Sequence, residues 1–404
     1  MRARRGVPTA YYGTVFNDPR TRNTDDHQYV DVSYQHSLAE KWELVARTSF
    51  DQYRLESLLA DPSGLPDGSV VVNKASGRGN WWDSELKLSR TLLEKHKLTF
   101  GSEVRDNLRQ DQANYAAASN SFQNSEHSSW NWALYTQDEF AITHRLTLSA
   151  GLRYDRYYSF GGTTNPRLGL IYHPFGQTNF KVLYGTAFRS PSVFETYSGA
   201  TGLFENNLRL VPETIRSIEG VVEQGLGHHF RLSGSVFDNR IEHLITQQTD
   251  PSTGMLVFLN SSKAQAKGTE IEFAGRSASG LLGTVSFSYV DGDADNPTDQ
   301  KLENSPRHMA KLNLIVPLVQ SRLFAGLEAQ YTGARLTEAR NQVGGFPLFN
   351  VTLLGHALGK HADLSGSVYN LLDRRYLDPA AVGFRQDAIQ QDGRSFRIKL
   401  TVRF

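Results

Sequence analysis

The C-terminal segment Phe396–Phe404 reads Phe-Arg-Ile-Lys-Leu-Thr-Val-Arg-Phe and alternates apolar and polar residues without a break. Successive side chains of an extended strand point to opposite faces, so this period of two predicts a β-strand with two chemically different faces. The apolar face would carry Phe396, Ile398, Leu400, Val402 and Phe404, and the polar face Arg397, Lys399, Thr401 and Arg403. A soluble β-sandwich and a membrane barrel both use such strands.

The same alternation recurs upstream with a charged polar face. One segment sets Trp42, Leu44, Ala46, Thr48 and Phe50 against Glu43, Arg47, Ser49 and Asp51. Another sets Leu146, Leu148, Ala150, Leu152 and Tyr154 against Thr147, Ser149, Arg153 and Asp155. In a soluble sandwich the apolar faces would meet in a core, whereas in a membrane barrel they face lipid and the polar faces line a wet lumen.

The lengths of the connections separate these two architectures. The alternation predicts about seventeen strands, at residues 27–37, 42–56, 76–91, 95–107, 129–141, 145–157, 165–174, 178–187, 211–224, 228–246, 255–275, 281–291, 304–316, 322–334, 346–358, 363–375 and 394–404. Tight turns alternate with longer connections of about 7 to 23 residues, which is typical of outer-membrane barrels, whose periplasmic turns are short and whose extracellular loops are long. We therefore predict an all-β fold, an antiparallel transmembrane β-barrel.

Composition excludes several other classes. Lys and Arg total 43 against 42 Asp and Glu, a formal charge of +1, so the chain lacks the basic field that gathers nucleic acid. No apolar run approaches the roughly 18 residues of a transmembrane helix. The chain has 0 Cys, which removes thiolate metal sites, thiol nucleophiles and disulfides.

The beginning of the chain does not read as the start of an exported barrel. Residues 1–5 are basic but no apolar segment follows them, so they do not form a secretory signal. Residues 1–26 are rich in turn-forming residues, and counting strands back from Phe404 puts them outside the cell. An odd strand number also conflicts with the even numbers of single-chain bacterial barrels. We expect residues 1–26 to be an extracellular loop of a truncated barrel and residues 27–404 to be the barrel.

Three motifs resemble the TonB-dependent receptor family, in its C-terminal barrel portion. The first combines residues 165–172 with residues 183–192 and includes Asn165, Pro166, Arg167, Phe188, Arg189 and Pro191, with Glu195 and Tyr197 following. The second is Asn304-Ser305-Pro306-Arg307-His308 at the start of a strand. The third is Asn370–Tyr376, which includes Asp373, followed by Gly393–Phe396 and the terminal Phe404.

The resemblance implies a barrel of about 22 strands around an N-terminal plug, of which about five strands, the plug and the TonB box would be absent here. It implies uptake of a metal chelate at the Gram-negative outer membrane, with a ferric siderophore as the first candidate and cobalamin or another metal complex as alternatives. The implied partners are the TonB complex, the chelate, and outer-membrane lipid and lipopolysaccharide. A passive porin-like barrel or a non-functional receptor fragment stands as the alternative, because in this family a barrel without its plug cannot perform coupled transport.

Aromatic residues in the predicted outer loops are the candidates for stacking on a flat ligand. These aromatic candidates for ligand contact are Tyr11, Tyr12, Phe16, Tyr115, Phe122, Tyr197 and Phe204. Arg189 is a further candidate, since its guanidinium could touch the ligand. The structural alternative places the aromatic residues in the girdle at the membrane interface. For Arg189 the alternative is a pair with plug or lumen carboxylates, with Pro191 ending the strand ladder.

The sequence predicts no metal site, no cofactor and no catalysis. Residues 291–296, Asp-Gly-Asp-Ala-Asp-Asn, have alternating oxygen ligands but lack Gly at the sixth position and Glu at the twelfth, where Leu302 stands. A solvated turn fits them better than a calcium loop. His228 and His229 fall in a turn, and no other His pair has metal-ligand spacing. No nucleophile motif stands out, so a surface enzyme is the least favoured class.

Overall fold

The structure is a computed structural model that describes residues 2–9, 13–37, 42–62, 69–201, 204–294, 301–319, 322–358, 361–381 and 383–403. Within these residues the helical segments are α1 (Val193–Tyr197) and the 3-10 helix η1 (Ser198–Thr201). Neither has the length or the apolarity to cross a lipid bilayer.

Strands make up nearly all of the remaining regular structure. They are β1 (Arg2–Gly6), β2 (Arg22–Ser37), β3 (Trp42–Asp61), β4 (Val71–Leu92), β5 (His96–Ala116), β6 (Ser121–Ser125), β7 (Ser129–Thr143), β8 (Leu146–Tyr157), β9 (Gly161–Phe175), β10 (Thr178–Arg189), β11 (Glu213–Leu226), β12 (Phe230–Thr249), β13 (Leu256–Arg276), β14 (Leu282–Ala294), β15 (His308–Val319), β16 (Leu323–Thr332), β17 (Arg335–Leu336), β18 (Gln342–Val343), β19 (Phe346–Leu358), β20 (Ala362–Tyr369), β21 (Leu377–Pro379), β22 (Ala388–Gln390) and β23 (Ser395–Val402). Every segment that the alternation predicts as a strand overlaps one of them.

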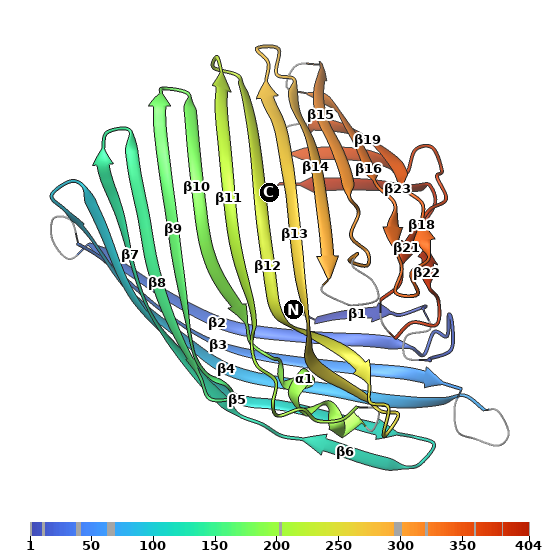
Figure 1. Ribbon diagram of the computed structural model, residues 1–404. Coiled ribbons are helices and arrows are strands. Elements are labelled where there is room, and N and C mark those ends of the chain that lie inside the picture. The colour runs from blue at the N-terminus through green and yellow to red at the C-terminus, as the bar shows by residue number, and fades with distance from the viewer. Residues whose placement is uncertain are drawn as a thin grey trace.

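One antiparallel sheet of 19 strands contains all the long strands of the described chain. Each long strand pairs with the long strands before and after it, as β3 does with β2 and β4. The pairs β17–β18 and β21–β22 are separate two-stranded ladders. Among the described strands of this sheet, β1, β6 and β23 have one neighbour each; β6 is a short strand that pairs with the end of β5, so β1 and β23 are the edges of the sheet. Figure 1 shows the sheet curving around in sequence order, from blue β2 to red β23, as the wall of a barrel does.

The two faces of this wall follow the alternation, which confirms the predicted strand faces. On the convex side, here called the outer face, apolar side chains are exposed: Leu86 is 51% exposed and Ile398 is 81% exposed. On the concave side, here called the inner face, Ser49 and Asp155 are buried and Arg153 is paired with carboxylates. This arrangement is inside out for a protein in water, and it suits strands with lipid on one side and a polar interior on the other.

The two ends of the sheet differ in their connections. At one end, the short-turn end, residues 93–95, 144–145, 176–177 and 227–229 are tight turns. In the first of these turns Leu93 and Glu94 have φ of 51° and 58°, the mirror-image turn that suits a twisted two-strand hairpin. At the other end, the long-loop end, lie β6, α1 and the connections 190–212 and 250–255.

Several boundaries differ from the sequence prediction. Within residues 1–26, expected to be a loop, β1 pairs with residues 22–26 of an extended β2. Both faces of these residues are polar, so no apolar alternation marks them as a strand. The expected strand 363–375 ends at Tyr369, because Asn370 has φ of 51° and turns the chain. The expected strand from residue 304 begins only at His308, after Pro306, since proline has no N–H to give to the ladder.

Candidate ligand-binding site at the long-loop end

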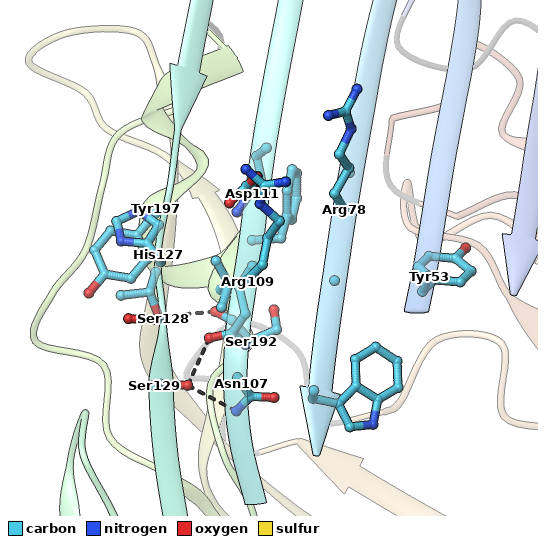
Figure 2. A pocket seen from close by; sticks show the side chains of 18 of the residues that line it. Tyr53, Arg78, Asn107, Arg109, Asp111, His127, Ser128, Ser129, Ser192 and Tyr197 are labelled. Carbon is cyan, nitrogen blue, oxygen red and sulfur yellow. Dashed lines mark hydrogen bonds and ion pairs between the residues drawn. The ribbon is translucent and has the colours of Figure 1, made fainter. Parts of the chain in front are cut away.

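A cavity of about 770 Å³ lies at the long-loop end, against the wall made by β3, β4, β5 and β7. We call it the site cavity (Figure 2). Its volume is in the range of pockets that take drug-sized ligands. Segment 190–197, which includes α1, closes one side of it. The site cavity therefore joins strand residues to a loop that comes from much later in the chain.

The strand wall of the site cavity contains aromatic and amide side chains together with the charged residues Arg78, Arg105, Arg109 and Asp111. Tyr53 on β3 and Trp81 on β4 lie on the inner face, and the Arg105 guanidinium lies 4.8 Å from the centre of the Trp81 ring. Arg105 Nε donates to Asn107 Oδ1 at 3.0 Å, and an Arg105 nitrogen lies 3.6 Å from Asp83. Arg105, which lies over the Trp81 ring, is thus already engaged by an amide and a carboxylate.

A β-bulge positions the amides. The register between β4 and β5 shifts between Asn80 and Trp81, so that Leu108 stands unpaired. Bulges re-aim the side chains around them, and here Asn107 and Gln110 both reach Ser129 on β7. Asn107 Nδ2 donates to Ser129 Oγ at 3.0 Å, and Ser129 Oγ donates to Gln110 Oε1 at 2.7 Å (Figure 2). This polar cluster offers hydrogen bonds without a net charge.

The loop side of the site cavity is held by a capped helix. Ser192 caps α1: its hydroxyl accepts from the Glu195 N–H, and the Ser192 N–H donates to Glu195. Arg189, the last residue of β10, binds both Glu195 and Glu213 at 2.9 Å and 2.6 Å. Burial alone would raise the pKa of Glu195, but its hydrogen bonds from Arg189 and Ser192 outweigh burial and hold that pKa below its usual value. Arg189 therefore locks the loop instead of presenting a free cation.

Tyr197 lines the site cavity and packs on a histidine from another connection. Its ring lies 3.7 Å from that of His127, centre to centre, with the planes 20° apart, and Figure 2 shows the two rings face to face. Burial lowers the pKa of His127, and the charge of Asp111 opposes this shift only in part. The stack joins segment 190–197 to the β6–β7 connection.

The other aromatic candidates lie away from the site cavity. Phe204 is 2% exposed and stacks on Phe258 at 5.4 Å, inside a loop cluster that also contains Phe194. Tyr115 and Phe122 face each other across β5 and β6 and lie on the outer face, because Asn114, the neighbour of Tyr115, lines the site cavity. Phe16 is exposed in a turn. Tyr11 and Tyr12 fall outside the described residues.

The motif residues lie mainly in structural positions. Asn165 is buried and accepts a hydrogen bond from Thr186. Phe188 packs edge-on against Tyr157, and the pairing of β9 with β10 ends at Arg167, next to Pro166. Pro191 lines the site cavity. In the C-terminal motif Asn370 exchanges hydrogen bonds with the Arg374 backbone, and Asp373 accepts from the Arg394 N–H. Phe404 lies outside the described residues.

No described group of three or more His, Asp and Glu side chains is arranged to hold a metal ion. Asp291 and Asp293, in the run that was compared with a calcium loop, both bind Lys301, at 2.9 Å and 2.6 Å. Asp295 and Asn296 of that run lie outside the described residues. Where described, residues 291–294 are the end of strand β14, paired with β13 and engaged by a lysine, so the solvated turn that the sequence predicts is wrong for this part of the run.

The strand residues that line the site cavity were not among the sequence candidates. Tyr53, Trp81 and Asn107 line the site cavity from the strands, and all three lie on the polar face of strands that the alternation predicts. If the alternation of each strand is continued past its apolar residues, Tyr53 and Trp81 are assigned to the inner face. Nothing in the residue pattern signals the bulge at Leu108 that places Asn107 beside Gln110.

The sequence is similar to a family model and to outer-membrane proteins of Vibrio cholerae. The family model described as "TonB dependent receptor-like, beta-barrel" matches residues 2–371. The vitamin B12 transporter BtuB of Vibrio cholerae is 27% identical over 238 residues, which cover 57% of this chain and 36% of the relative. The iron-regulated outer membrane virulence protein of the same species is 23% identical over 337 residues, which cover 77% of this chain and 50% of the relative. The chain thus spans about a third to a half of the length of these relatives.

Solved structures match the fold over almost the whole chain. The ferric-catecholate import receptor Fiu of E. coli K12 superposes with a TM-score of 0.76 at 16% identity, covering 95% of this chain and 65% of that one. The copper transporter OprC superposes with a TM-score of 0.76 at 14% identity, covering 95% of this chain and 66% of that one. At such identities the likeness concerns the fold alone.

Proposed function

The chain belongs to the TonB-dependent receptor-like β-barrel family and is an outer-membrane protein, and from this premise we propose that it binds and helps to import a metal chelate. Proteins of this family are transporters, not enzymes. The observation that carries the proposal is the site cavity, about 770 Å³ in volume and bounded by strands and by α1 at the long-loop end. In outer-membrane barrels the long loops face the cell exterior, so the site cavity is where a solute from outside would first be held.

The chemistry of the site cavity supports a large, flat or amide-bearing ligand. Trp81, Tyr53 and Tyr197 offer aromatic faces for stacking, and Asn107, Gln110 and Ser129 offer neutral donors and acceptors. A ferric siderophore is our first candidate and a corrinoid our second. The sequence relatives include a vitamin B12 transporter and an iron-regulated outer membrane virulence protein.

The remaining parts of the proposal rest on family membership. We propose that residues 27–404 form barrel wall, that the complete wall of such a receptor has about 22 strands closed around a plug, and that TonB supplies the energy for release. Outer-membrane lipid would surround the apolar outer face. Residues 1–26 would lie at the exterior end of the wall.

Two neighbouring tryptophans provide the test, because Trp81 faces the site cavity and Trp82 lies on the outer face, where it is exposed. The full chain, folded in neutral detergent, is dialysed to equilibrium against ferric tris-catecholate and, separately, cyanocobalamin. For the chelate that binds, we expect Trp81→Ala to weaken binding about fivefold to tenfold, the loss of one stacking contact. Trp82→Ala should leave binding within about twofold. Equal losses in the two variants, or no saturable binding of either chelate, would refute the proposal.

A further inference from the structure

A second cavity, about 380 Å³ in volume, adjoins the site cavity on the inner face, and we call it the inner pocket. Arg105, Asn131 and Tyr157 line both cavities, so they stand at the boundary between them. The other charged residues that line the inner pocket are three carboxylates and two arginines, namely Asp83, Glu85, Glu103, Arg47 and Arg153. A cation that leaves the site cavity at this boundary therefore meets carboxylates in the inner pocket.

Arg105 reaches from the inner pocket into the site cavity. In the pairing of β4 with β5, Arg105 stands opposite Asp83, and Asn107 stands opposite Trp81. The Arg105 guanidinium nevertheless lies over the Trp81 ring, 4.8 Å from its centre, and its Nε donates to Asn107 Oδ1 at 3.0 Å. The side chain thus points toward the long-loop end and occupies a ring face on which a flat ligand would stack.

The present contacts of Arg105 are weaker than those of the other two arginines of the inner pocket. Its ion pair with Asp83 spans 3.6 Å, whereas Arg47 binds Asp31 and Arg153 binds Glu103 at 2.6 Å each. A cation over an aromatic ring at a partly exposed site is also a weak contact. A competing ligand therefore has only a ring contact and one neutral acceptor to replace.

The Trp81 ring is held from another side, so the guanidinium is the part that can move. The His27 ring lies 6.2 Å from the Trp81 ring with the planes 25° apart, and His27 Nε2 lies 3.0 Å from Asp51 Oδ1. A small rotation of the Arg105 side chain would shorten its pair with Asp83 into a charge-assisted hydrogen bond, which is stronger than a bond to a neutral amide. The displaced cation thus has a carboxylate within reach.

We propose that Arg105 is an exchange residue: a flat ligand that stacks on Trp81 displaces the Arg105 guanidinium, which then pairs with Asp83 in the inner pocket. This inference rests on the proposed function and deepens it. It makes Arg105 a specificity-determining residue, because a ligand must offer a π face that replaces a cation on Trp81. It also means that filling the site cavity moves a positive charge toward the inner pocket.

A double-mutant cycle tests the exchange. The full chain in neutral detergent is dialysed to equilibrium against whichever of ferric tris-catecholate and cyanocobalamin the wild-type chain binds. We expect Asp83→Asn to weaken binding about threefold to fivefold, since the displaced guanidinium loses its carboxylate. In the Arg105→Gln background the same Asp83→Asn change should alter binding by less than about 1.5-fold, because no guanidinium has to be received.

Arg216→Gln is the matched control for the removal of one positive charge. Arg216 is exposed on β11 and shares the outer face with Ile218, which is also exposed. In the Arg216→Gln background Asp83→Asn should still weaken binding about threefold to fivefold. Electrophoresis of unheated samples checks that each variant is folded before binding is measured.

Each other outcome overturns the exchange. Equal effects of Asp83→Asn with and without Arg105 would mean that Asp83 acts through its own charge, and no effect in either background would mean that it receives nothing. A loss of more than about tenfold in Arg105→Gln alone would make Arg105 a direct ligand of the chelate. Binding by the wild-type chain without this coupling refutes only the exchange. Absence of binding by the wild-type chain refutes the proposed function and the exchange with it.

Discussion

The inner and outer faces of the wall contain alternate residues of the same strands, yet their side chains are held in opposite ways. On the inner face Arg153 binds Glu103 and the buried Asp155 at 2.6 Å and 2.9 Å. On the outer face Leu86 and Ile398 are exposed. The inner face is held together by specific polar pairs, and the outer face depends on the solvent outside it. A substitution should therefore act through solvation on one face and through lost partners on the other.

The largest effect should come from placing a charge on the outer face. Leu400 is an exposed apolar residue of β23, and a cation at mid-depth in lipid costs about 2–4 kcal/mol. We expect Leu400→Arg to lower the free energy of unfolding by that amount in bilayers, measured by urea titration of the folded band on electrophoresis. The neighbouring Lys399→Arg should change it little. Equal losses would show that the two faces are assigned incorrectly.

An intermediate effect should follow from removing a partner on the inner face. Arg153→Ala leaves Asp155, which is 2% exposed, without its cation. Since Arg153 itself is a third exposed, we expect a loss of about 1–2 kcal/mol in the free energy of unfolding, less than for a fully buried pair. The control is Arg231→Ala, whose more open pair with Glu272 should contribute below about 1 kcal/mol. If both variants lose the same stability, the inner face is no more organised than an open surface.

The smallest effect should be local, at the loop that closes the site cavity. The folded pKa of Glu195 is below its ordinary value of 4.5, so its contribution to docking of the loop is complete above about pH 4.5 and is lost as pH falls through the lower folded value. We expect hydrogen exchange in residues 190–201 to quicken below about pH 4.5 while the strands stay protected. Arg189→Ala should quicken exchange already at pH 7 and flatten the pH dependence. Unchanged exchange at pH 7 would mean that Arg189 does not lock the loop.

The strands and their two faces could be predicted from the sequence because each strand alternates apolar and polar residues. Trp42, Phe50, Leu152 and Leu400 lie on the face that the alternation assigns them, and the tight turns fall between the same strands. The extension of β2 and the pairing of β1 were missed because residues 22–26 are polar on both faces, where the rule has no signal.

The sequence could indicate the candidate site only in part, because loop residues follow no period that would show which way a side chain points. Tyr115 and Tyr197 looked equivalent as loop aromatics, yet one lies on the outer face and the other lines the site cavity. The difference depends on strand register at the end of β5 and on the path of segment 190–197, and both are set by long-range pairing. The alternation of side chains between the two faces is enough to place Trp81 on the inner face. The position of Asn107 depends on the bulge at Leu108, which the sequence does not indicate.

The loop cluster of Phe194, Phe204 and Phe258 is the part of the long-loop end that most resembles the core of a water-soluble protein, with Leu210 and Val257 also buried. Phe194 and Phe204 come from the connection 190–212 while Val257 and Phe258 belong to β13, so the cluster joins this connection to one strand of the wall. Tyr53 on β3 and Gln110 on β5 are not part of the cluster, and we expect that they can be exchanged without unpacking it. Such a division of labour lets ligand preference evolve in small steps on a barrel that stays the same.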